Sequence, residues 1–227
     1  MTAYLSPAET EALSLSLRVA AVAVAAALPF ALAAAVLLER WRFPGKIVLD
    51  GLIHVPLVLP PVAMGFLLLT IFGTRAGLGG WLFRVLGIQF VFHWTGAALA
   101  AAIITFPFQV RAIRIALQAA DRGLEDAAET LGAGPIDRLV NLTLPLAFPG
   151  VVAGLITAFA ASLGEFGAII TFVSNIPGET RTLPLAIYTA LQTPGGETEA
   201  AKLSLISIVL ALVFMTLAEL LQRRMRR

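Results

Sequence analysis

The chain contains no cysteine among its 227 residues. Disulfide bonds, cysteine-ligated metals and thiol nucleophiles are therefore excluded. The chain also lacks a G-x4-G-K-S/T phosphate loop, an H-E-x-x-H motif and a G-x-S-x-G motif, and it has only two histidines. We therefore expect no enzyme activity, no cofactor and no metal site. In particular, we expect that this chain does not hydrolyse ATP.

Charge is also scarce. Charged residues make up 13% of the chain and hydrophobic residues 59%, and the mean hydropathy is +0.90. Too little polar surface exists to coat a soluble globule, so the composition indicates an integral membrane protein. The net charge is +2, but the arginines are scattered over short loops and one tail. They form no basic stripe, which argues against nucleic-acid binding.

Long apolar runs predict an all-α, polytopic membrane protein that forms one domain over residues 1–227. Roughly 20 helical residues, at about 1.5 Å each, cross a hydrocarbon core of about 30 Å. Five spans are expected: about Val19 to Leu38, about Ile47 to Phe72, about Thr95 to Gln109, a fourth that begins at Pro145, and about Leu203 to Leu221. Between the last two, the Leu183 to Leu191 stretch is too short to cross and predicts an interfacial or re-entrant helix.

The second span is irregular because Pro56, Pro60 and Pro61 fall inside it. Proline removes a backbone donor and clashes with the preceding turn, so this helix must kink or break. It is either a kinked packing helix or a moving, pore-lining one. Asp50 and His54 lie four residues apart near its start and form either a structural couple or part of a proton relay.

The distribution of Lys and Arg predicts the orientation. Eleven lie in one set of loops and tail, against four in the other set. The first set comprises Arg40, Arg42, Lys46, Arg111, Arg114, Arg122, Arg138, Arg223, Arg224, Arg226 and Arg227, and the second comprises Arg75, Arg84, Arg181 and Lys202. By the positive-inside rule the first set is cytoplasmic, so the N-terminus lies outside and the C-terminus inside.

The stretch from Glu125 to Pro145 is the only long polar island in the middle of the chain. Leu124, Ala127, Ala128 and Leu131 recur at helical spacing and make an apolar face, while Glu125, Asp126 and Glu129 make a solvated one. The glycines and proline of residues 132–135 should end this helix. It is either a surface-lying connector or a knob for a soluble partner.

The spacing of this stretch resembles the E-A-A-x3-G-x9-I-x-L-P segment of permease subunits of bacterial ABC importers. Asp126 stands at the Glu position, followed by Ala127, Ala128 and Gly132; Leu142 stands at the Ile position, before Leu144 and Pro145. Glu125 could supply the longer carboxylate. The resemblance implies a cytoplasmic coupling helix that docks on a separate ATPase subunit. We call Glu125 to Pro145 the coupling segment.

Further stretches, among them HVPLVLPPVAMGFLLL and SLGEFGAIITFVSNIPGETRTLPLAIYTALQTPGGE, resemble the molybdate permease subunits of this family. The resemblance implies a bacterial inner-membrane importer of a tetrahedral oxyanion. It also implies a homodimer with a second permease copy, two cytoplasmic ATP-binding subunits and a periplasmic oxyanion-binding protein. Sulfate, thiosulfate or tungstate permeases are alternatives, as is a polytopic membrane enzyme or packing subunit without a transport role.

An anion path should offer hydroxyls and small residues rather than a strong trap. Helical rise from Pro145 places Thr157 and Ser162 in the middle and outer half of the fourth span, with Glu165 near its outer end. Small residues around Ser162 would let two copies approach at a pore axis. An unpaired carboxylate would repel the substrate, so Glu165 is expected to point into the protein and pair with Arg181, near the path or simply holding the loop.

Overall fold

The computed structural model describes residues 5–75, 77–119 and 122–225. Every regular element within these ranges is a helix, which confirms the all-α prediction. The helices are α1 (Pro7–Arg40), α2 (Lys46–Val58), α3 (Pro61–Phe72), α4 (Gly77–Leu86), α5 (Trp94–Ala119), α6 (Arg122–Thr130), α7 (Pro135–Arg138), the π-helical turn η1 (Leu139–Thr143), α8 (Leu144–Leu163), α9 (Gly167–Val173), α10 (Leu183–Leu191) and α11 (Glu197–Met225). Arg226 and Arg227, which the orientation count includes, lie outside the described residues.

Four helical runs are long and apolar enough to cross a membrane: Pro7–Arg40, Trp94–Ala119, Pro135–Leu163 and Glu197–Leu221. The second predicted span is instead a pair, α2 and α3, bent by 116°. The described residues therefore contain five spans only if this pair counts as one.

Helix α1 begins well before Val19 because Ser6 caps it: its Oγ accepts the Glu9 N–H at 3.2 Å.

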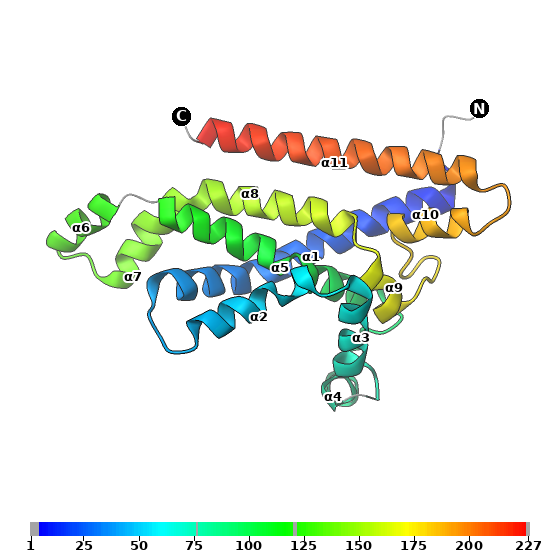
Figure 1. The fold of residues 1–227 in the computed structure, drawn as a ribbon, viewed down its shortest axis with the longest axis horizontal. Coiled ribbons are helices and arrows are strands. Elements are labelled where there is room, and N and C mark those ends of the chain that lie inside the picture. Colours follow the sequence, from blue (N-terminus) through cyan, green and yellow to red (C-terminus); the bar gives the residue numbers. More distant parts are fainter. Residues whose placement is uncertain (1–4, 76, 120–121, 226–227) are drawn as a thin grey trace.

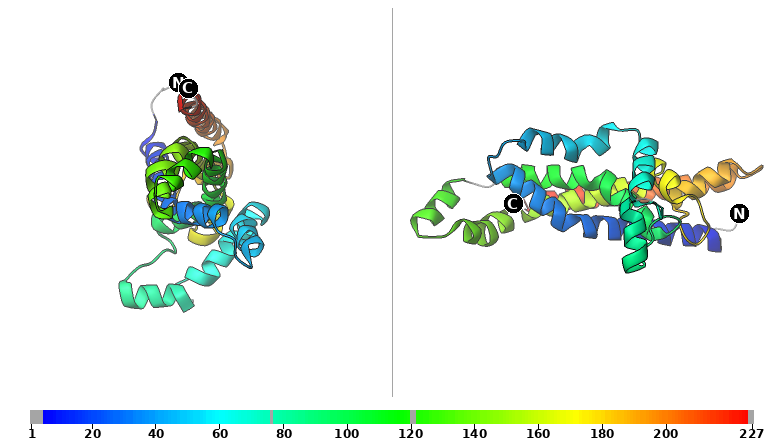
Figure 2. Two further views of the ribbon diagram at one scale, coloured as in Figure 1. Left: turned by 90° about the vertical axis from the view of Figure 1, so that its left-hand side faces the viewer. Right: turned by 90° about the horizontal axis from the view of Figure 1, so that it is seen from below.

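The prolines of the second span break it, as predicted. Pro56 lies inside α2, Pro60 is the N-cap of α3, and Pro61 is the first residue of α3. The residue before a proline is pushed into an extended conformation, and Leu59 is extended at φ −69° and ψ 141°. Figures 1 and 2 show the consequence: α2 runs along the bundle, whereas α3 and α4 turn across it.

Helices α1, α5 and α8 form the centre of the bundle, and α11 packs along α8 (Figure 1). Small residues bring α5 and α8 together. A Cβ on Gly150 would lie 2.2 Å from the Cβ of Ala116, and one on Gly154 would lie 2.7 Å from the Cβ of Ala112. Gly150 and Gly154 thus form a close-packing face of α8 against α5.

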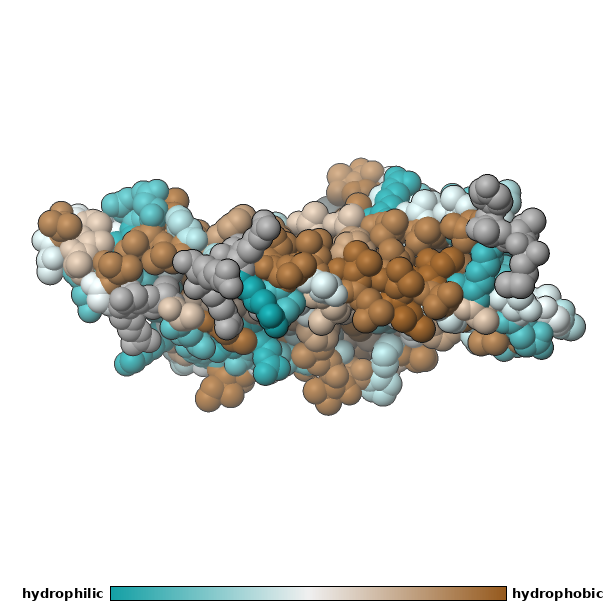
Figure 3. Space-filling view, turned by 90° about the horizontal axis from the view of Figure 1, so that it is seen from above, coloured by the Kyte–Doolittle hydropathy of each residue, from teal (hydrophilic) through white to brown (hydrophobic). Residues whose placement is uncertain are grey.

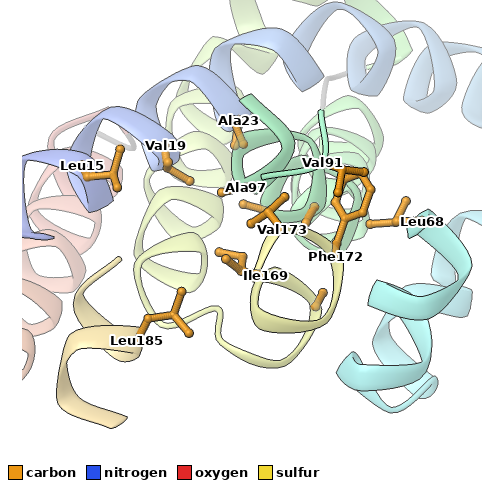
Figure 4. Packing of buried hydrophobic residues seen from close by; sticks show 14 residues of the cluster. Leu15, Val19, Ala23, Leu68, Val91, Ala97, Ile169, Phe172, Val173 and Leu185 are labelled. Atoms are coloured by element: carbon orange, nitrogen blue, oxygen red, sulfur yellow. The ribbon is translucent and has the colours of Figure 1, made fainter. Parts of the chain in front are cut away.

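Apolar clusters hold both ends of the bundle. One cluster joins α1, α3, α5, α9 and α10 and includes Leu15, Val19, Ile169, Phe172 and Leu185 (Figure 4). The other joins the opposite end of α1 to α5 and α8 and includes Leu38, Val110, Ile113, Leu117 and Val151. Helix α10 has the bounds predicted for the short helix, and its Leu183 N–H donates to Ser16 Oγ of α1 at 2.6 Å.

Helix α11 leaves most of its large apolar side chains on the surface. Leu205, Ile208 and Leu212 are all more than half exposed. Figure 3 shows that hydrophobic residues cover much of the middle of this side of the molecule. A helix that is apolar where it is exposed fits a lipid environment, since lipid tails solvate such side chains and water does not.

Candidate coupling site

The coupling segment lies at one end of the bundle, where α6 and α7 project beyond α1, α5 and α8 (Figure 1). It consists of most of α6, a glycine-containing turn, α7, η1 and the first residues of α8. Pro145 lies in the first turn of α8, where its missing amide donor costs least. The segment therefore leads directly from a projecting helix into a membrane-crossing one.

Helix α6 ends where glycine was expected to end it. Gly132 has φ +89°, in the left-handed region. Its N–H donates to Glu129 O at 2.9 Å, and the Ala133 N–H donates to Ala128 O at 3.0 Å. These two bonds are the pair that defines a Schellman cap, so Gly132 reverses the chain towards α7.

Glu125 faces the bundle rather than solvent. Both oxygens of its carboxylate accept hydrogen bonds from the guanidinium of Arg40, the last residue of α1. Thr143 Oγ1, at the end of η1, donates to Glu125 Oε1 at 2.6 Å. The Glu125 side chain is only 12% exposed. The prediction of a solvated Glu125 is therefore wrong, because the helical period shows which residues share a face but not which face meets the protein.

These contacts fix the ionisation of Glu125. Hydrogen bonding to the Arg40 guanidinium lowers its pKa to about 2, and the Thr143 hydroxyl and the charge of Arg138 act in the same direction. Because the folded-state pKa lies below the ordinary value, the stabilising contribution is complete above the ordinary pKa. It is lost only as the pH falls towards 2. Glu125 thus remains a carboxylate at any physiological pH.

The opposite side of the coupling segment is apolar and exposed. Leu131 is 89% exposed and Leu124 47%. Asp126 and Ala127 are exposed beside them. An apolar face left without a covering element on a projecting helix fits a protein partner better than a solvated connector. Ala128 is half-buried and supports α6 from its inner side.

A second ion pair folds the coupling segment on itself. Arg138 of α7 binds the carboxylate of Glu129 on α6. A cavity of about 380 Å³ lies between the end of α1 and α6, α7 and η1, lined among others by Arg40, Trp41 and Ile136. The segment is therefore a folded unit tied to the bundle at Glu125.

The residues predicted for the anion path do not form one group. Thr157 is half-buried, and its Oγ1 donates to Ala153 O within α8 at 2.9 Å. Ser162 is 3% exposed. Its hydroxyl is thus covered by this chain, and an anion or a second copy could reach it only after neighbouring elements moved.

The predicted Glu165–Arg181 pair is wrong. Glu165 is buried and accepts the N–H of Ala168 at 2.9 Å, across the start of α9. Arg181 Nε instead donates to Asn175 Oδ1 at 2.9 Å. Among the described residues no ion pair includes either side chain. Glu165 does point into the protein, but the first turn of α9 offers it a backbone donor three residues away.

We expect Glu165→Ala and Arg181→Ala to act independently. Residues that share no partner usually have additive effects, to within about 0.5 kcal/mol. The fall in thermal stability of the double variant should therefore equal the sum of the two single falls. Unfolding midpoints of the purified single and double variants in detergent measure this. A double variant no less stable than one of the singles would mean that the two side chains do interact.

Comparison with known proteins gives the family. A family described as binding-protein-dependent transport system inner membrane component matches residues 15–227. The chain belongs to this family. The permease is 54% identical over 219 residues to the molybdenum transport system permease protein ModB of Escherichia coli (strain K12). The aligned region covers 96% of each of the two chains. The permease is 50% identical over 219 residues to the protein of that name from Haemophilus influenzae, again with 96% of both chains covered.

More distant relatives place the permease within the same fold. The sulfate transport system permease protein CysT of Escherichia coli (strain K12) is 35% identical over 198 residues, covering 86% of this chain and 71% of CysT. A bacterial alginate ABC transporter crystallised with its periplasmic protein superposes with a TM-score of 0.76 at 18% identity, over 96% of this chain and 80% of that one. An amino acid ABC transporter has a TM-score of 0.70 at 22% identity, covering 96% and 94%.

Two residues of the permease site escaped the sequence reasoning. The sequence presents Arg40 only as one of the cations that predict the orientation, and Thr143 only as a residue inside the coupling segment. Thr143 gave a weak signal of a polar contact, because its hydroxyl lies between two apolar residues, Leu142 and Leu144. No signal existed for Arg40, because its partner is 85 residues away.

The polar couple of the second span is structural. Asp50 Oδ1 accepts a hydrogen bond from Arg114 Nη1 of α5 at 2.7 Å. His54 Nδ1 lies 2.8 Å from the Asp50 backbone oxygen, one helical turn earlier. The Asp50 carboxylate is thus already bound by an arginine of another helix. This network ties α2 to α5.

Proposed function

We propose that this chain is the membrane-spanning permease subunit of an ATP-driven ABC importer that carries molybdate across the bacterial inner membrane. The observation that carries the proposal is the identity to molybdenum permeases, 54% and 50% over 96% of the chain. The sulfate relative is at 35% over 86%. Sulfate, thiosulfate and tungstate are the same kind of tetrahedral dianion, so they are the alternative substrates. Discrimination among them falls to a periplasmic binding protein.

ATP hydrolysis is assigned to two cytoplasmic subunits that dock on the coupling segment. The exposed apolar side chains of α6 and of the turn after it support this proposal. The most exposed of them is Leu131, in the turn. Asp126 lies exposed on the same helix and is the acid available to a partner, because Glu125 is occupied by Arg40. Ala127 and Ala128 keep the helix slim enough to enter a groove.

We expect Leu131→Glu to detach the ATP-binding subunit without disturbing the permease. Leu131 is 89% exposed, so a charge there is harmless in the free chain. In a docked interface it would place a carboxylate where an apolar anchor sits, at a cost of about 2 kcal/mol or more. The measurement is co-isolation of the nucleotide-binding subunit with tagged permease, followed by molybdate-dependent ATP hydrolysis in vesicles with the loaded binding protein.

Leu131→Met is the matched control, since it keeps an apolar side chain of similar volume at the same position. It should co-isolate the subunit as well as the parent chain does. If Leu131→Glu also co-isolates it fully, the apolar face of α6 is not the docking surface. ATP hydrolysis that responds to sulfate-loaded and not molybdate-loaded binding protein would favour the sulfate alternative.

The complete importer contains a second copy of this chain and a periplasmic binding protein. Within its described residues, one copy supplies one coupling segment and at most five spans, which is half of what two ATP-binding subunits require. We propose that the N-terminus and the α10 end lie outside, and that the coupling segment and the C-terminus lie inside. The distribution of Lys and Arg supports this orientation.

The absence of cysteine makes the orientation directly testable. Ser6→Cys and Pro194→Cys, both at exposed positions near the start of α1 and of α11, should react with an impermeant thiol reagent added outside intact cells. Asp137→Cys, exposed on α7, should react only after the membrane is opened. Labelling of position 137 from outside would overturn the orientation and the cytoplasmic docking with it.

A membrane enzyme or packing subunit without a transport role is the alternative from another class. Such an enzyme would need converging ionisable groups. The available groups have two separate sets of partners instead: Asp50 binds Arg114 and lies against His54, whereas Glu165 binds the Ala168 backbone. If the chain is pulled down and no nucleotide-binding subunit co-isolates with it, this alternative is favoured.

A further inference from the structure

The inner end of α1 lies where the coupling segment meets the bundle. Arg40, its last residue, binds both oxygens of Glu125 on α6 through its two terminal nitrogens. The same guanidinium lies 3.3 Å from Thr143 Oγ1. Thr143 in turn donates to Glu125 at 2.6 Å. Three side chains from three elements, α1, α6 and η1, therefore close one polar triangle, which we call the Arg40 lock.

The Arg40 lock differs from an ordinary surface ion pair. Exposed pairs hold their partners weakly, because water and ions compete for them. Here the Arg40 side chain is 31% exposed but that of Glu125 only 12%, and Thr143 is 1% exposed. The contact is also bidentate, which fixes the angle between the guanidinium and the carboxylate as well as their distance. The lock thus constrains the orientation of α6 relative to α1.

The residue before Arg40 connects α1 to the rest of the bundle. Glu39 Oε2 accepts a hydrogen bond from Gln118 of α5 at 2.8 Å and lies 3.9 Å from Arg114 Nε. Arg114 also binds Asp50 of α2 at 2.7 Å. Polar contacts therefore join α6 to Arg40, and the adjacent Glu39 to α5 and through Arg114 to α2, with the backbone of α1 connecting the two sets. Helix α2 leads into the proline break before α3.

Thr143 provides the second branch. It is the last residue of η1, a π-helical turn that continues into α8. A π turn holds more residues than an α turn, and such turns occur often at functional sites. A displacement of Glu125 would act on Thr143 and so on the start of the long helix that follows. Helix α6 otherwise packs chiefly against the short α7.

We propose that Arg40 and Thr143 are positioning residues of the transport cycle, which carry the movement of the docked coupling segment into α1 and α8 through Glu125. The proposal rests on the proposed function, because it presupposes an ATP-driven partner that moves α6. It predicts that breaking the Arg40 lock uncouples hydrolysis from transport. It also predicts that restoring an ion pair in reverse restores coupling.

The test uses the full permease assembled in vesicles with its ATP-binding subunit and loaded binding protein. Arg40→Glu and Glu125→Arg are measured singly and together, as molybdate transported per ATP hydrolysed. Each single variant should lower this ratio about tenfold, within the usual range of coupling between sites. The double reversal should recover most of the loss. Co-isolation of the ATP-binding subunit should persist in all three, because Glu125 faces away from the exposed side.

Arg42→Glu is the matched control. Arg42 lies two residues further along the same loop, is exposed, and makes no ion pair within the described part of the chain. The substitution changes the charge of this loop by the same amount as Arg40→Glu. The transport ratio should therefore stay at the parent value, which separates the loss of the lock from the loss of a positive charge at the membrane surface.

Two outcomes overturn the proposal: a normal transport ratio in Arg40→Glu, or single defects that the double reversal does not repair. If a charge-reversal variant fails to insert into the membrane, Arg40→Lys and Thr143→Val are measured in its place. Lysine cannot bind both carboxylate oxygens in the same way, and valine removes only the hydroxyl. Each should lower the ratio about threefold, at the low end of such coupling, and unchanged ratios in both would also overturn the proposal. A parent complex that never couples ATP to transport would instead refute the proposed function.

Discussion

Replacing Gly150 by alanine is expected to destabilise the bundle, because the new Cβ would lie 2.2 Å from the Cβ of Ala116. Non-bonded carbons sit best at about 3.5–4.0 Å, so α5 and α8 would have to move apart. Overpacking of this kind costs up to about 3 kcal/mol, and alanine returns about 1 kcal/mol in helix propensity. The net loss should be about 2 kcal/mol, seen as a lower unfolding midpoint in detergent.

Combining Gly150→Ala with Ala116→Gly should restore the parent stability. The exchange moves one methyl group across the same seam, so the clash disappears and the two changes in helix propensity cancel. Gly51→Ala is the control for propensity alone, since a Cβ on this α2 residue meets nothing within 4 Å. It should be neutral or stabilising. A double variant as unstable as Gly150→Ala would show that α5 and α8 do not meet at these residues.

Replacing Gly132 by leucine is expected to impair transport while membrane insertion survives. Gly132 has φ +89°, a conformation that costs a residue with a Cβ about 1 kcal/mol or more. That cost corresponds to roughly a fivefold fall in the population of the correct turn. The turn sets the angle between α6 and α7, so the coupling segment would meet its partner wrongly. The transport rate should fall about as much.

Gly134→Leu is the matched control in the same turn. Gly134 has φ −71° and ψ 164°, which any residue adopts, and a Cβ there meets nothing within 4 Å. Its transport rate should stay close to that of the parent chain. If Gly132→Leu also transports normally with the ATPase still bound, the left-handed turn is not needed for coupling.

Local features of the chain were predictable from the sequence. Uncharged runs of about 20 residues marked the crossing helices, because only apolar side chains are stable in a hydrocarbon core. Gly132 marked the end of α6, and Pro60 with Pro61 marked the break between α2 and α3. Leu183 to Leu191 marked α10. Each of these depends on backbone geometry and on neighbours along the chain.

The spacing of the coupling segment was equally available from the sequence. Which side of α6 would face the bundle was not. The helical period groups Leu131 with Leu124, and in a protein that stands alone the apolar group would turn inward. Here the carboxylate of Glu125 turns inward, because α1 presents Arg40 at that point, and the apolar side remains exposed at 89% for Leu131.

Ion-pair partners were decided by tertiary structure alone. Glu165 and Arg181 are close in sequence and opposite in charge, yet Glu165 binds the Ala168 backbone and Arg181 binds Asn175. Arg40 and Glu125 are 85 residues apart and bind each other through both oxygens. The sequence determined which residues enter the membrane and where helices end, since those choices are local. Only the packing of α1, α5 and α8 decided which charges meet, because attraction between side chains acts over distances in space that the order of residues does not specify.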